Sequence, residues 1–330
     1  MRNIFKKKKY LDCRHMKHSI HFFYDEIRCC CSNVSGPIFY PDYEGEEIDW
    51  DFIFKSRKKL AKEVNSFFSD KSIPDCCYNC FEIQNYLSDK KIKSFENQIN
   101  MLYIQNNMSC NAKCTYCSFS DEERGYRYSV LPHIKTLIEK EILAPNAYVF
   151  MSGGEITIIP EFDELLDLMF SYKRVKVEIL TSGIKYSEKI KYGFLNKKLS
   201  LVISLDSGCP ETYFKIKQVD AFDKIISNLK DYTSRSNYAK ENIMLKYIIV
   251  DGVNDNKQEI DKFLDIVSGL GIKKVRLDVD FLKYSLNNDL KVPEIYFELF
   301  EYFEQKAKDL NLNLLKYDQI DMILKKERKI

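Results

Sequence analysis

Long apolar runs are missing from this chain of 330 residues. No uncharged apolar stretch approaches the roughly 20 residues that a helix needs to span a bilayer. The basic run at residues 6–9 is not followed by the apolar stretch of about 7–15 residues that a signal peptide requires. Both absences favour a solvated basic segment, and they predict a cytoplasmic protein with no membrane contact.

An excess of charge of one sign is also absent, because 51 lysines and arginines are balanced by 49 aspartates and glutamates. The formal net charge of +2 gives no reason to expect a nucleic acid as partner. With 45% apolar residues and no low-complexity linker, the composition argues against disorder. The length exceeds one typical domain and leaves room for a full core.

Cysteine, in contrast, is abundant: the chain has eleven, and ten of them precede residue 118. They fall into groups of short spacing in a large chain with no export signal. In that setting, such groups indicate metal binding rather than disulfide bonds.

From residue 98 onward, short apolar strands alternate with amphipathic helices. We predict strands at 98–105, 147–151, 176–181, 200–205, 243–250 and 274–281, and helices at 131–143, 161–172, 187–195, 220–232 and 257–270. This order predicts an α/β fold whose parallel sheet curls into a partial (β/α)6 TIM-like barrel, with its chemistry at the carboxyl ends of the strands.

The two ends of the chain do not follow this alternation. We expect a cysteine-rich module at 1–95, the barrel at 96–285 and a helical extension at 286–330. The module should contain a hairpin within 18–29 and a helix at 50–68. A helix at 294–310 should be followed by a short charged tail.

Three cysteines follow the first barrel strand in the order Cys110-Asn-Ala-Lys-Cys114-Thr-Tyr-Cys117. Thiolates at this spacing can bind three irons of a [4Fe-4S] cluster and leave the fourth iron open. A structural zinc site is the alternative, and it would need a fourth ligand nearby. None lies between residues 118 and 132, and His133 is expected at the surface of a predicted helix.

About thirty-five residues further on, a strand ends in Gly153-Gly-Glu155. Together the two motifs resemble the radical S-adenosylmethionine (radical SAM) superfamily. The resemblance implies a [4Fe-4S] cluster on the three cysteines and S-adenosylmethionine as second cofactor. Gly153 and Gly154 would let the backbone approach a ligand, and Glu155 would accept a hydrogen bond from the cofactor ammonium. Ile156 stands where the family usually has proline.

The same resemblance assigns roles near the ends of later strands. Leu180-Thr-Ser-Gly183 resembles the family's Thr-Asn-Gly, Ile203-Ser-Leu-Asp206 resembles its Ser-x-Asp, and 253–255 fits its next loop. The residues implied to bind the cofactor are Tyr116, Thr181, Ser204, Lys246 and Val250. Asp206 is implied to line the substrate side as the catalytic residue. Ordinary packing would equally explain Tyr116, a turn would explain Thr181, and strand alternation leaves Lys246 free to point outward.

The N-terminal cysteines are Cys13, the triplet 29–31 and the group Cys76, Cys77 and Cys80. Their order resembles the SPASM/Twitch auxiliary-cluster modules, which usually follow the barrel and here precede it. The resemblance implies a second iron-sulfur cluster with Cys13, Cys30, Cys77 and Cys80 as first-choice ligands and Cys29, Cys31 and Cys76 as alternatives. A zinc-stabilised or merely cysteine-rich module is the competing interpretation.

The resemblance implies an enzyme that cleaves S-adenosylmethionine to a 5′-deoxyadenosyl radical, which abstracts hydrogen from a substrate. A peptide or protein side chain is the expected substrate, a sugar or surface-glycan precursor is the alternative, and a zinc-bound adaptor without turnover is the hypothesis from another class. A reducing partner such as flavodoxin or ferredoxin is expected. For His15, His18 and His21 we expect structural or surface roles on a strand, and Cys209 should be an ordinary loop thiol.

Overall fold

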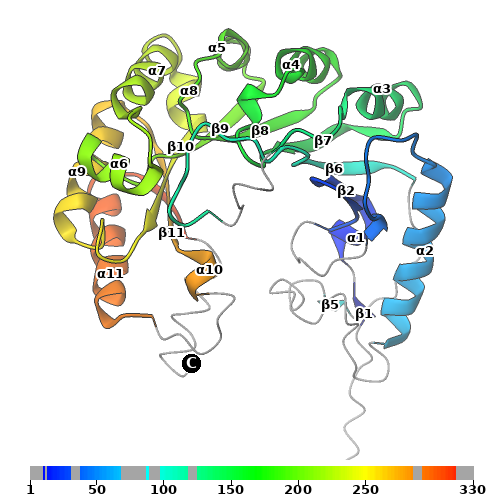
Figure 1. Cartoon of the computed structure of the whole chain (residues 1–330), viewed down its shortest axis with the longest axis horizontal. Coiled ribbons are helices and arrows are strands. Elements are labelled where there is room, and N and C mark those ends of the chain that lie inside the picture. Colours follow the sequence, from blue (N-terminus) through cyan, green and yellow to red (C-terminus); the bar gives the residue numbers. More distant parts are fainter. Residues whose placement is uncertain are drawn as a thin grey trace, which may run out of the picture. The chain divides into compact units, whose positions relative to one another are not determined.

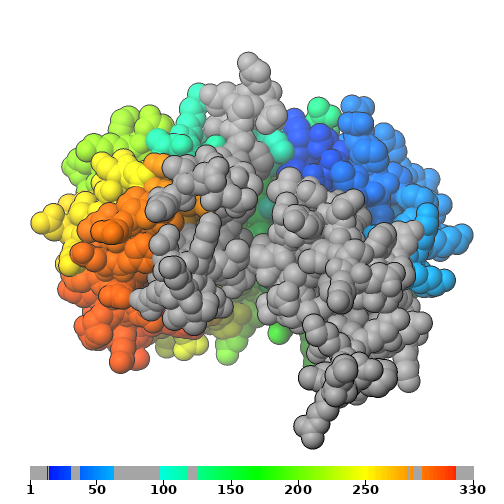
Figure 2. Space-filling view, turned by 90° about the horizontal axis from the view of Figure 1, so that it is seen from below, coloured from blue at the N-terminus to red at the C-terminus, as the bar shows by residue number. Residues whose placement is uncertain are grey.

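A computed structural model describes residues 10–11, 13–30, 38–67, 87–88, 97–117, 125–284 and 292–316. Figures 1 and 2 colour the described residues by their position in the chain. The chain forms two compact units. The first comprises Met1–Asn107, Tyr126–Gly153 and Ser171–Lys176, and the second comprises Met108–Gly125, Gly154–Phe170 and Val177–Ile330. Each is described on its own below.

The first unit contains a sheet with the strand order β7-β6-β2-β3-β4. Its elements are α1 (Arg14–His18), β2 (Ser19–Phe22), β3 (Ile27–Arg28), β4 (Ile38–Tyr40), α2 (Trp50–Phe67), β6 (Ile99–Ile104), α3 (Leu131–Glu139) and β7 (Leu143–Met151). The strands β2, β6 and β7 are parallel neighbours, whereas β3 is antiparallel to both β2 and β4. A separate antiparallel pair joins β1 (Tyr10–Leu11) and β5 (Leu87–Ser88).

The second unit contains the strand order β8-β9-β10-β11-β12, in which every neighbouring pair is parallel. These strands are β8 (Lys176–Thr181), β9 (Leu199–Ser204), β10 (Ile243–Ile249), β11 (Lys274–Val279) and β12 (Asn313–Lys316). The remaining elements are η4 (Ile156–Ile158), α4 (Phe162–Ser171), α5 (Glu188–Leu195), α6 (Pro210–Lys217), α7 (Phe222–Ser234), α8 (Asn237–Asn242), α9 (Lys257–Gly269), α10 (Phe281–Tyr284) and α11 (Glu294–Asp309). In Figure 1, helices α5, α7, α9 and α11 lie along one side of this sheet.

Helix α9 shows how the sequence determines one of these β/α units. The side chain of Asn256 caps its first turn by accepting a hydrogen bond from the Glu259 amide at 3.0 Å. Apolar residues at a period of three to four then form one buried face, with Ile260, Phe263, Leu264 and Val267 at 1% exposure or less. After Leu270, Gly271 adopts φ +68°, the left-handed conformation that commonly ends a helix.

The alternation of strands and helices predicted from residue 98 onward is confirmed, with element limits that shift by a few residues. The α/β class is confirmed with it. The helix predicted at 131–143 ends at Glu139, because β7 begins earlier than predicted, at Leu143. The pattern did not predict the short helices α6 and α8, each of which follows a strand or helix within a few residues. No helix in the described ranges is both long and apolar enough to cross a membrane.

The N-terminal hairpin is confirmed, since Phe22 pairs with Ile27 across β2 and β3. The sequence did not predict that this hairpin joins the parallel strands. Strand β2 is buried along its whole length and pairs in parallel with β6. The charged tail predicted after the helix at 294–310 is wrong at Asn313–Lys316, which form β12 against β11. The predicted domain limits stay a prediction.

His133 was expected at the surface and is instead 7% exposed. Its ring stacks on Phe22 at a centroid distance of 5.7 Å, and its Nε2 atom lies 2.8 Å from the Tyr43 hydroxyl. Burial lowers the pKa of His133, which favours the neutral ring. The prediction failed because the first turn of α3 packs inward, and helix position alone does not reveal which face is covered.

Candidate active site

The three core cysteines lie on the loop 108–117, and all three are partly exposed. Backbone hydrogen bonds hold this loop at several points. The Lys113 amide donates to the Lys217 carbonyl and the Thr115 amide donates to the Ile216 carbonyl, both at 2.9 Å. The Cys117 amide donates to the Cys114 carbonyl at 3.0 Å and closes a turn between the last two thiols. The loop therefore has a defined backbone although its thiol side chains reach solvent.

Cys114 lies close to a buried lysine. Burial raises the pKa of Cys114, while the nearby Lys217 ammonium acts in the opposite direction. Iron bound to a thiolate replaces the proton, so a raised pKa concerns the metal-free thiol only. As a donor set, three thiols on one fixed loop fit three irons of a [4Fe-4S] cluster. Among the described residues, no three His, Cys, Asp or Glu side chains lie close enough to share one metal ion.

The Gly-Gly-Glu turn follows β7 and packs against the cysteine loop. A Cβ atom on Gly154 would lie 2.3 Å from the Ser109 carbonyl oxygen. Gly153 has φ +118°, a conformation open to glycine, and a Cβ there would lie 2.4 Å from the Asn107 carbonyl oxygen. The sequence predicted that these glycines let a ligand approach. The close approach in the structure is to the backbone of 107–109, directly before Cys110.

Glu155 is fully buried. Its Oε1 atom accepts hydrogen bonds from the hydroxyls of Thr157 and Thr181, both at 2.6 Å, and Oε2 accepts one from the Ser182 amide at 2.6 Å. Its own amide donates to the Ser109 carbonyl at 2.7 Å. Glu155 thus connects the start of the cysteine loop to the end of β8. The hydroxyl of Thr181 is directed to Glu155, and its predicted contact with the cofactor stays a prediction.

Asp206 was predicted to line the substrate side, but its side chain is fully buried. The Tyr116 hydroxyl donates to its Oδ2 atom at 2.5 Å, and Lys217 forms an ion pair with the same oxygen. Its Oδ1 atom accepts a hydrogen bond from the Ile248 amide at 2.8 Å. The carboxylate therefore connects the cysteine loop, α6 and β10. The predicted role of Asp206 on the substrate side stays a prediction.

Three other predicted cofactor residues lie on or just after β9 and β10: Ser204 ends β9, Lys246 lies in the middle of β10 and Val250 follows β10. Ser204 and Lys246 are register partners on these strands, so both side chains lie on the same face. Lys246 is 17% exposed and pairs with Asp278 of β11 at 3.2 Å. Val250 follows β10, and its amide donates to the Asn254 side chain at 2.7 Å. Their contacts with a cofactor stay predictions.

Only part of the predicted auxiliary site lies within the described residues. Cys13 precedes α1 and Cys30 follows β3, and both are partly exposed. Cys29 is buried at 1% exposure. Cys31, Cys76, Cys77 and Cys80 lie outside the described ranges.

Arg57 of α2 is a buried cation in the same unit as these cysteines. It is 1% exposed, and its three guanidinium nitrogens have no hydrogen-bond partner among the residues that the structure describes. Its charged group lies 6.0 Å from the Phe39 ring centroid and 5.8 Å from that of Phe54. Burial lowers the pKa of Arg57 to about 10, and the thiol of Cys29 opposes the shift. A buried charge without an ionic partner is costly, so this site favours an anion.

The histidines of the N-terminal region differ in part from the predicted strand, and their structural or surface roles stay a prediction. His15 and His18 belong to α1, and His21 belongs to β2. Burial, followed by the charge of Arg28, lowers the pKa of His21 to about 3. Cys209, predicted as a loop thiol, precedes α6, where its Sγ lies 3.3 Å from the Thr212 hydroxyl.

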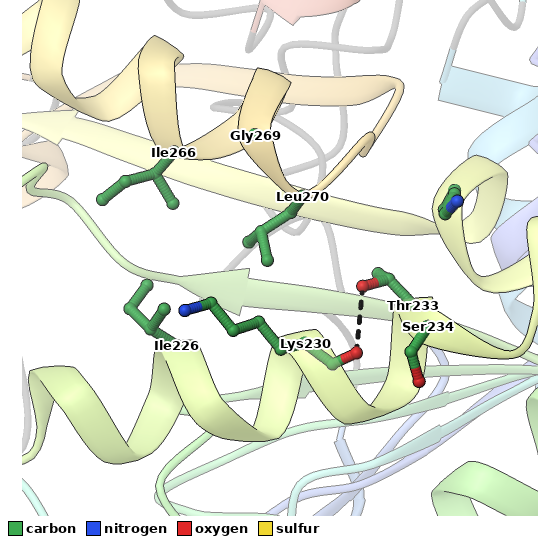
Figure 3. Close-up of a pocket in the computed structure, with 8 residues that line it drawn as sticks. Ile226, Lys230, Thr233, Ser234, Ile266, Gly269 and Leu270 are labelled. Atoms are coloured by element: carbon green, nitrogen blue, oxygen red, sulfur yellow. Dashed lines mark hydrogen bonds between the residues drawn. The ribbon is translucent and has the colours of Figure 1, made fainter.

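A cavity of about 550 Å³ lies between α7, α8 and α9 (Figure 3). Its lining residues are Ile226, Lys230, Thr233, Ser234, Lys240, Ile266, Gly269 and Leu270. None of the predicted site residues lines it. This cavity is therefore separate from the candidate site. Nothing in the described residues indicates what would occupy it.

Sequence reasoning missed Lys217 and Asn254. Asn254 donates hydrogen bonds to the carbonyls of Asp206 and Ile248, both at 2.8 Å, and so connects two strand ends. Lys217 ends α6, whose mixed sequence does not distinguish a buried lysine from an exposed one. For Asn254 the available sequence signal was its place in the loop 253–255, which resembles a loop of the family.

Residues 108–267 match the Radical SAM superfamily family model. A probable GTP 3′,8-cyclase of Saccharolobus islandicus is 26% identical over 211 residues, which cover 60% of this chain and 65% of that protein. The structure of Streptococcus suis SuiB bound to precursor peptide SuiA has a TM-score of 0.52 at 14% identity and covers 84% of this chain and 57% of that one. Native anSMEcpe with bound AdoMet has a TM-score of 0.51 at 17% identity, over 65% of this chain and 63% of that one.

The chain thus spans less than two thirds of the length of each of these three proteins. At these identities the two solved structures show a shared fold and no more. The superfamily uses a [4Fe-4S] cluster and S-adenosylmethionine. With the cysteine loop and the Gly-Gly-Glu turn packed on it, the match means that residues 108–267 of this chain form a radical SAM domain.

Proposed function

We propose that this chain is an enzyme that cleaves S-adenosylmethionine reductively and abstracts hydrogen from a peptide or protein side chain. The observation that carries the proposal is the cysteine loop, whose three thiols sit on a backbone fixed by hydrogen bonds to α6 and to the Gly-Gly-Glu turn. Cys110, Cys114 and Cys117 would hold the cluster. When bound, that group supplies an electron to S-adenosylmethionine and yields a 5′-deoxyadenosyl radical.

The residues around the loop position it. Glu155 joins the loop start to β8 through buried hydrogen bonds, and a buried carboxylate with several donors has little freedom to move. Ser204 and Lys246 share one face of neighbouring strands, where a hydroxyl and an ammonium suit the ribose and carboxylate of the cofactor. A reductant such as flavodoxin or ferredoxin would supply electrons from outside.

The substrate class rests on the cysteine-rich N-terminal region, which resembles modules found in enzymes that modify peptides. SuiB, which shares the fold, was solved with a precursor peptide, and the matched Saccharolobus protein is named as a probable GTP 3′,8-cyclase. A sugar or glycan precursor remains the second candidate. The chemistry itself distinguishes these classes, because the abstracted hydrogen ends in 5′-deoxyadenosine.

We expect deuterium to pass from a deuterated peptide pool into 5′-deoxyadenosine when the reduced protein turns over S-adenosylmethionine. The measurement is the mass of 5′-deoxyadenosine after incubation with a fully deuterated peptide digest, with deuterated sugar nucleotides, or with deuterated GTP. Deuterium transfer from sugar nucleotides or GTP alone would refute a peptide as the substrate, but it would still support the proposal that the chain is an enzyme. Unlabelled 5′-deoxyadenosine from every pool would refute all three substrate classes.

We further propose that the N-terminal cysteines bind an anionic metal-thiolate centre, a second iron-sulfur cluster, with Arg57 as its counter-ion. The support is the buried guanidinium without a hydrogen-bond partner among the described residues, which interacts with the Cys29 thiol. Helix α1, which follows Cys13, packs against α2, which contains Arg57. A cluster held by thiolates is negatively charged, so it would compensate the cation.

Arg57→Met should therefore have opposite effects on the two states of the protein. In the metal-free protein it removes a buried charge that has no partner among the described residues, and it should stabilise the fold because such a charge is costly to bury. In the reconstituted protein it should lower the metal content to that of the core site alone. Urea unfolding of the metal-free protein and metal analysis of the reconstituted protein measure the two effects.

The matched control is Lys58→Met, an exposed position on the same helix, which should change neither quantity. Full metal loading of the Arg57→Met protein would refute the counter-ion role. A loss of stability in the metal-free variant would mean instead that Arg57 already has an acidic partner outside the described residues.

A further inference from the structure

Lys217, the last residue of α6, is 2% exposed, which is rare for a lysine unless its charge is paired. Its Nζ atom forms an ion pair with Asp206, which is fully buried, and donates a hydrogen bond to the Tyr116 hydroxyl. Burial is the largest single effect and opposes the charged form, but Asp206 together with Cys114 and Cys110 outweighs it and raises the pKa of Lys217. The ammonium is therefore charged at every physiological pH.

The backbone of α6 holds the cysteine loop at the same place. A helix leaves its last four carbonyls without intrahelical partners. Here two carbonyls of the last turn, those of Ile216 and Lys217, accept hydrogen bonds from the loop amides of Thr115 and Lys113. Gln218 then adopts φ +55° and ends the helix. The Lys217 side chain and the Lys217 carbonyl thus contact the two sides of Cys114, at Tyr116 and at Lys113.

Asp206 fixes the position of this charge. Its amide donates to the Lys246 carbonyl at 3.0 Å, and its carbonyl accepts a hydrogen bond from Asn254 at 2.8 Å. It adopts φ +58°, a conformation that costs energy for a residue with a side chain. Strain of this kind persists only where the surroundings enforce it, so the carboxylate has one defined position beside Lys217.

Both charges of the pair reach the cysteine loop at the Tyr116 hydroxyl, between Cys114 and Cys117. Both are buried, so water does not screen them. Each should therefore act on a cluster held by the loop with the sign of its own charge.

We propose that Lys217 is a positioning residue whose buried ammonium, held by Asp206 and Tyr116, raises the reduction potential of the cluster bound by Cys110, Cys114 and Cys117. The potential of an iron-sulfur cluster depends on net charge, on hydrogen bonds near the sulfurs and on exposure to solvent. A fixed cation beside the thiolates stabilises the reduced cluster, which is the more negative form. This inference rests on the proposed function, since it requires that the three thiols hold a cluster.

The proposed effect changes the midpoint potential in a direction that depends on which charge is removed. An ion pair with a purely structural role would not have this effect. Lys217→Met removes the cation and leaves the carboxylate, so the midpoint potential should become more negative. Asp206→Asn removes the anion and keeps the cation, so the potential should become less negative. Lys217→Arg keeps the charge and should restore a potential near that of the wild type.

The experiment is a redox titration of the anaerobically reconstituted full chain, followed by electron paramagnetic resonance without S-adenosylmethionine. The Cys110→Ala/Cys114→Ala/Cys117→Ala protein gives the signal of any second cluster, which is subtracted. Lys215→Met, an exposed position on α6, is the control and should leave the potential unchanged. Iron content is measured in every sample.

Equal potentials in Lys217→Met and wild type, at equal iron content, would overturn the proposal, as would shifts of the same sign in Lys217→Met and Asp206→Asn. Should Lys217→Met fail to fold, the double variant Lys217→Met/Asp206→Asn replaces it, because a buried pair exchanged for neutral groups is tolerated better than a broken pair. Its potential should lie below that of Asp206→Asn, and an equal value would overturn the proposal. Absence of core iron from the wild type would refute the proposed function instead.

Discussion

Replacing Cys110, Cys114 and Cys117 with alanine should remove about four irons per chain and abolish the formation of 5′-deoxyadenosine, since each thiolate binds a different iron of one [4Fe-4S] cluster. Iron and sulfide analysis of anaerobically reconstituted protein measures the first effect, and chromatography of the reaction products under reducing conditions measures the second. The expected loss is complete because a cluster without protein ligands does not stay bound.

Cys209→Ala is the matched control. Cys209 is also partly exposed and lies in the same unit, but its thiol contacts Thr212 and Glu259 at the start of α6 and α9. Its iron content and product yield should equal those of the wild type. Unchanged iron in the triple variant would contradict the cluster assignment, and zinc in place of iron in the wild type would favour the non-catalytic adaptor.

The sequence predicts most of the second unit because its signals are local. The spacing of the three cysteines needs only eight residues, and the strand at Lys176–Thr181 was predicted at its observed limits. The glycines before Glu155 indicated a tight approach, which the sequence assigned to a ligand and which the structure shows for the backbone of 107–109. Periodicity and spacing are properties of short segments, so they can be recognised without knowledge of the rest of the fold.

The partners of buried polar groups lie far away in the sequence, and the sequence analysis did not predict them. Asp206 meets Lys217 only because α6 returns toward the end of β9, and α6 itself was not predicted. The Glu155 carboxylate receives hydrogen bonds from residues up to 27 positions away. A sequence motif shows that such a residue is present, whereas its role depends on which groups the topology places beside it.

Two roles can explain the glycines of the Gly-Gly-Glu turn: close approach of a ligand, or close packing on the cysteine loop. The substitution Gly154→Ala distinguishes them. If Gly154 serves only the approach of a ligand, a methyl group there should weaken cofactor binding and leave the free protein unaffected. If Gly154 is instead required for packing against the loop backbone, the substitution should destabilise the protein without cofactor. The structure favours packing, because a Cβ on Gly154 would lie 2.3 Å from the Ser109 carbonyl oxygen and 2.6 Å from the Met108 carbonyl carbon.

Both of those atoms belong to the backbone and cannot move aside as a flexible side chain would. The Ser109 carbonyl also accepts the hydrogen bond from the Glu155 amide, so relief of the clash must break this bond or displace the loop directly before Cys110. We expect Gly154→Ala to destabilise the metal-free protein by about 1–3 kcal/mol, the usual cost of overpacking, and to lower the iron content of the core site. Urea unfolding and iron analysis, both without S-adenosylmethionine, measure these effects.

Gly269→Ala provides the comparison, because no atom lies within 4 Å of a Cβ built at this position near the end of α9. That substitution should leave the iron content unchanged and raise stability by about 0.4–1 kcal/mol, since alanine restricts the unfolded chain more than glycine does. If Gly154→Ala had the stability and the iron content of the wild type, the turn would be able to move enough to relieve the clash at little cost. The two glycines would then serve the ligand, as the sequence alone suggested, rather than the position of the cysteine loop.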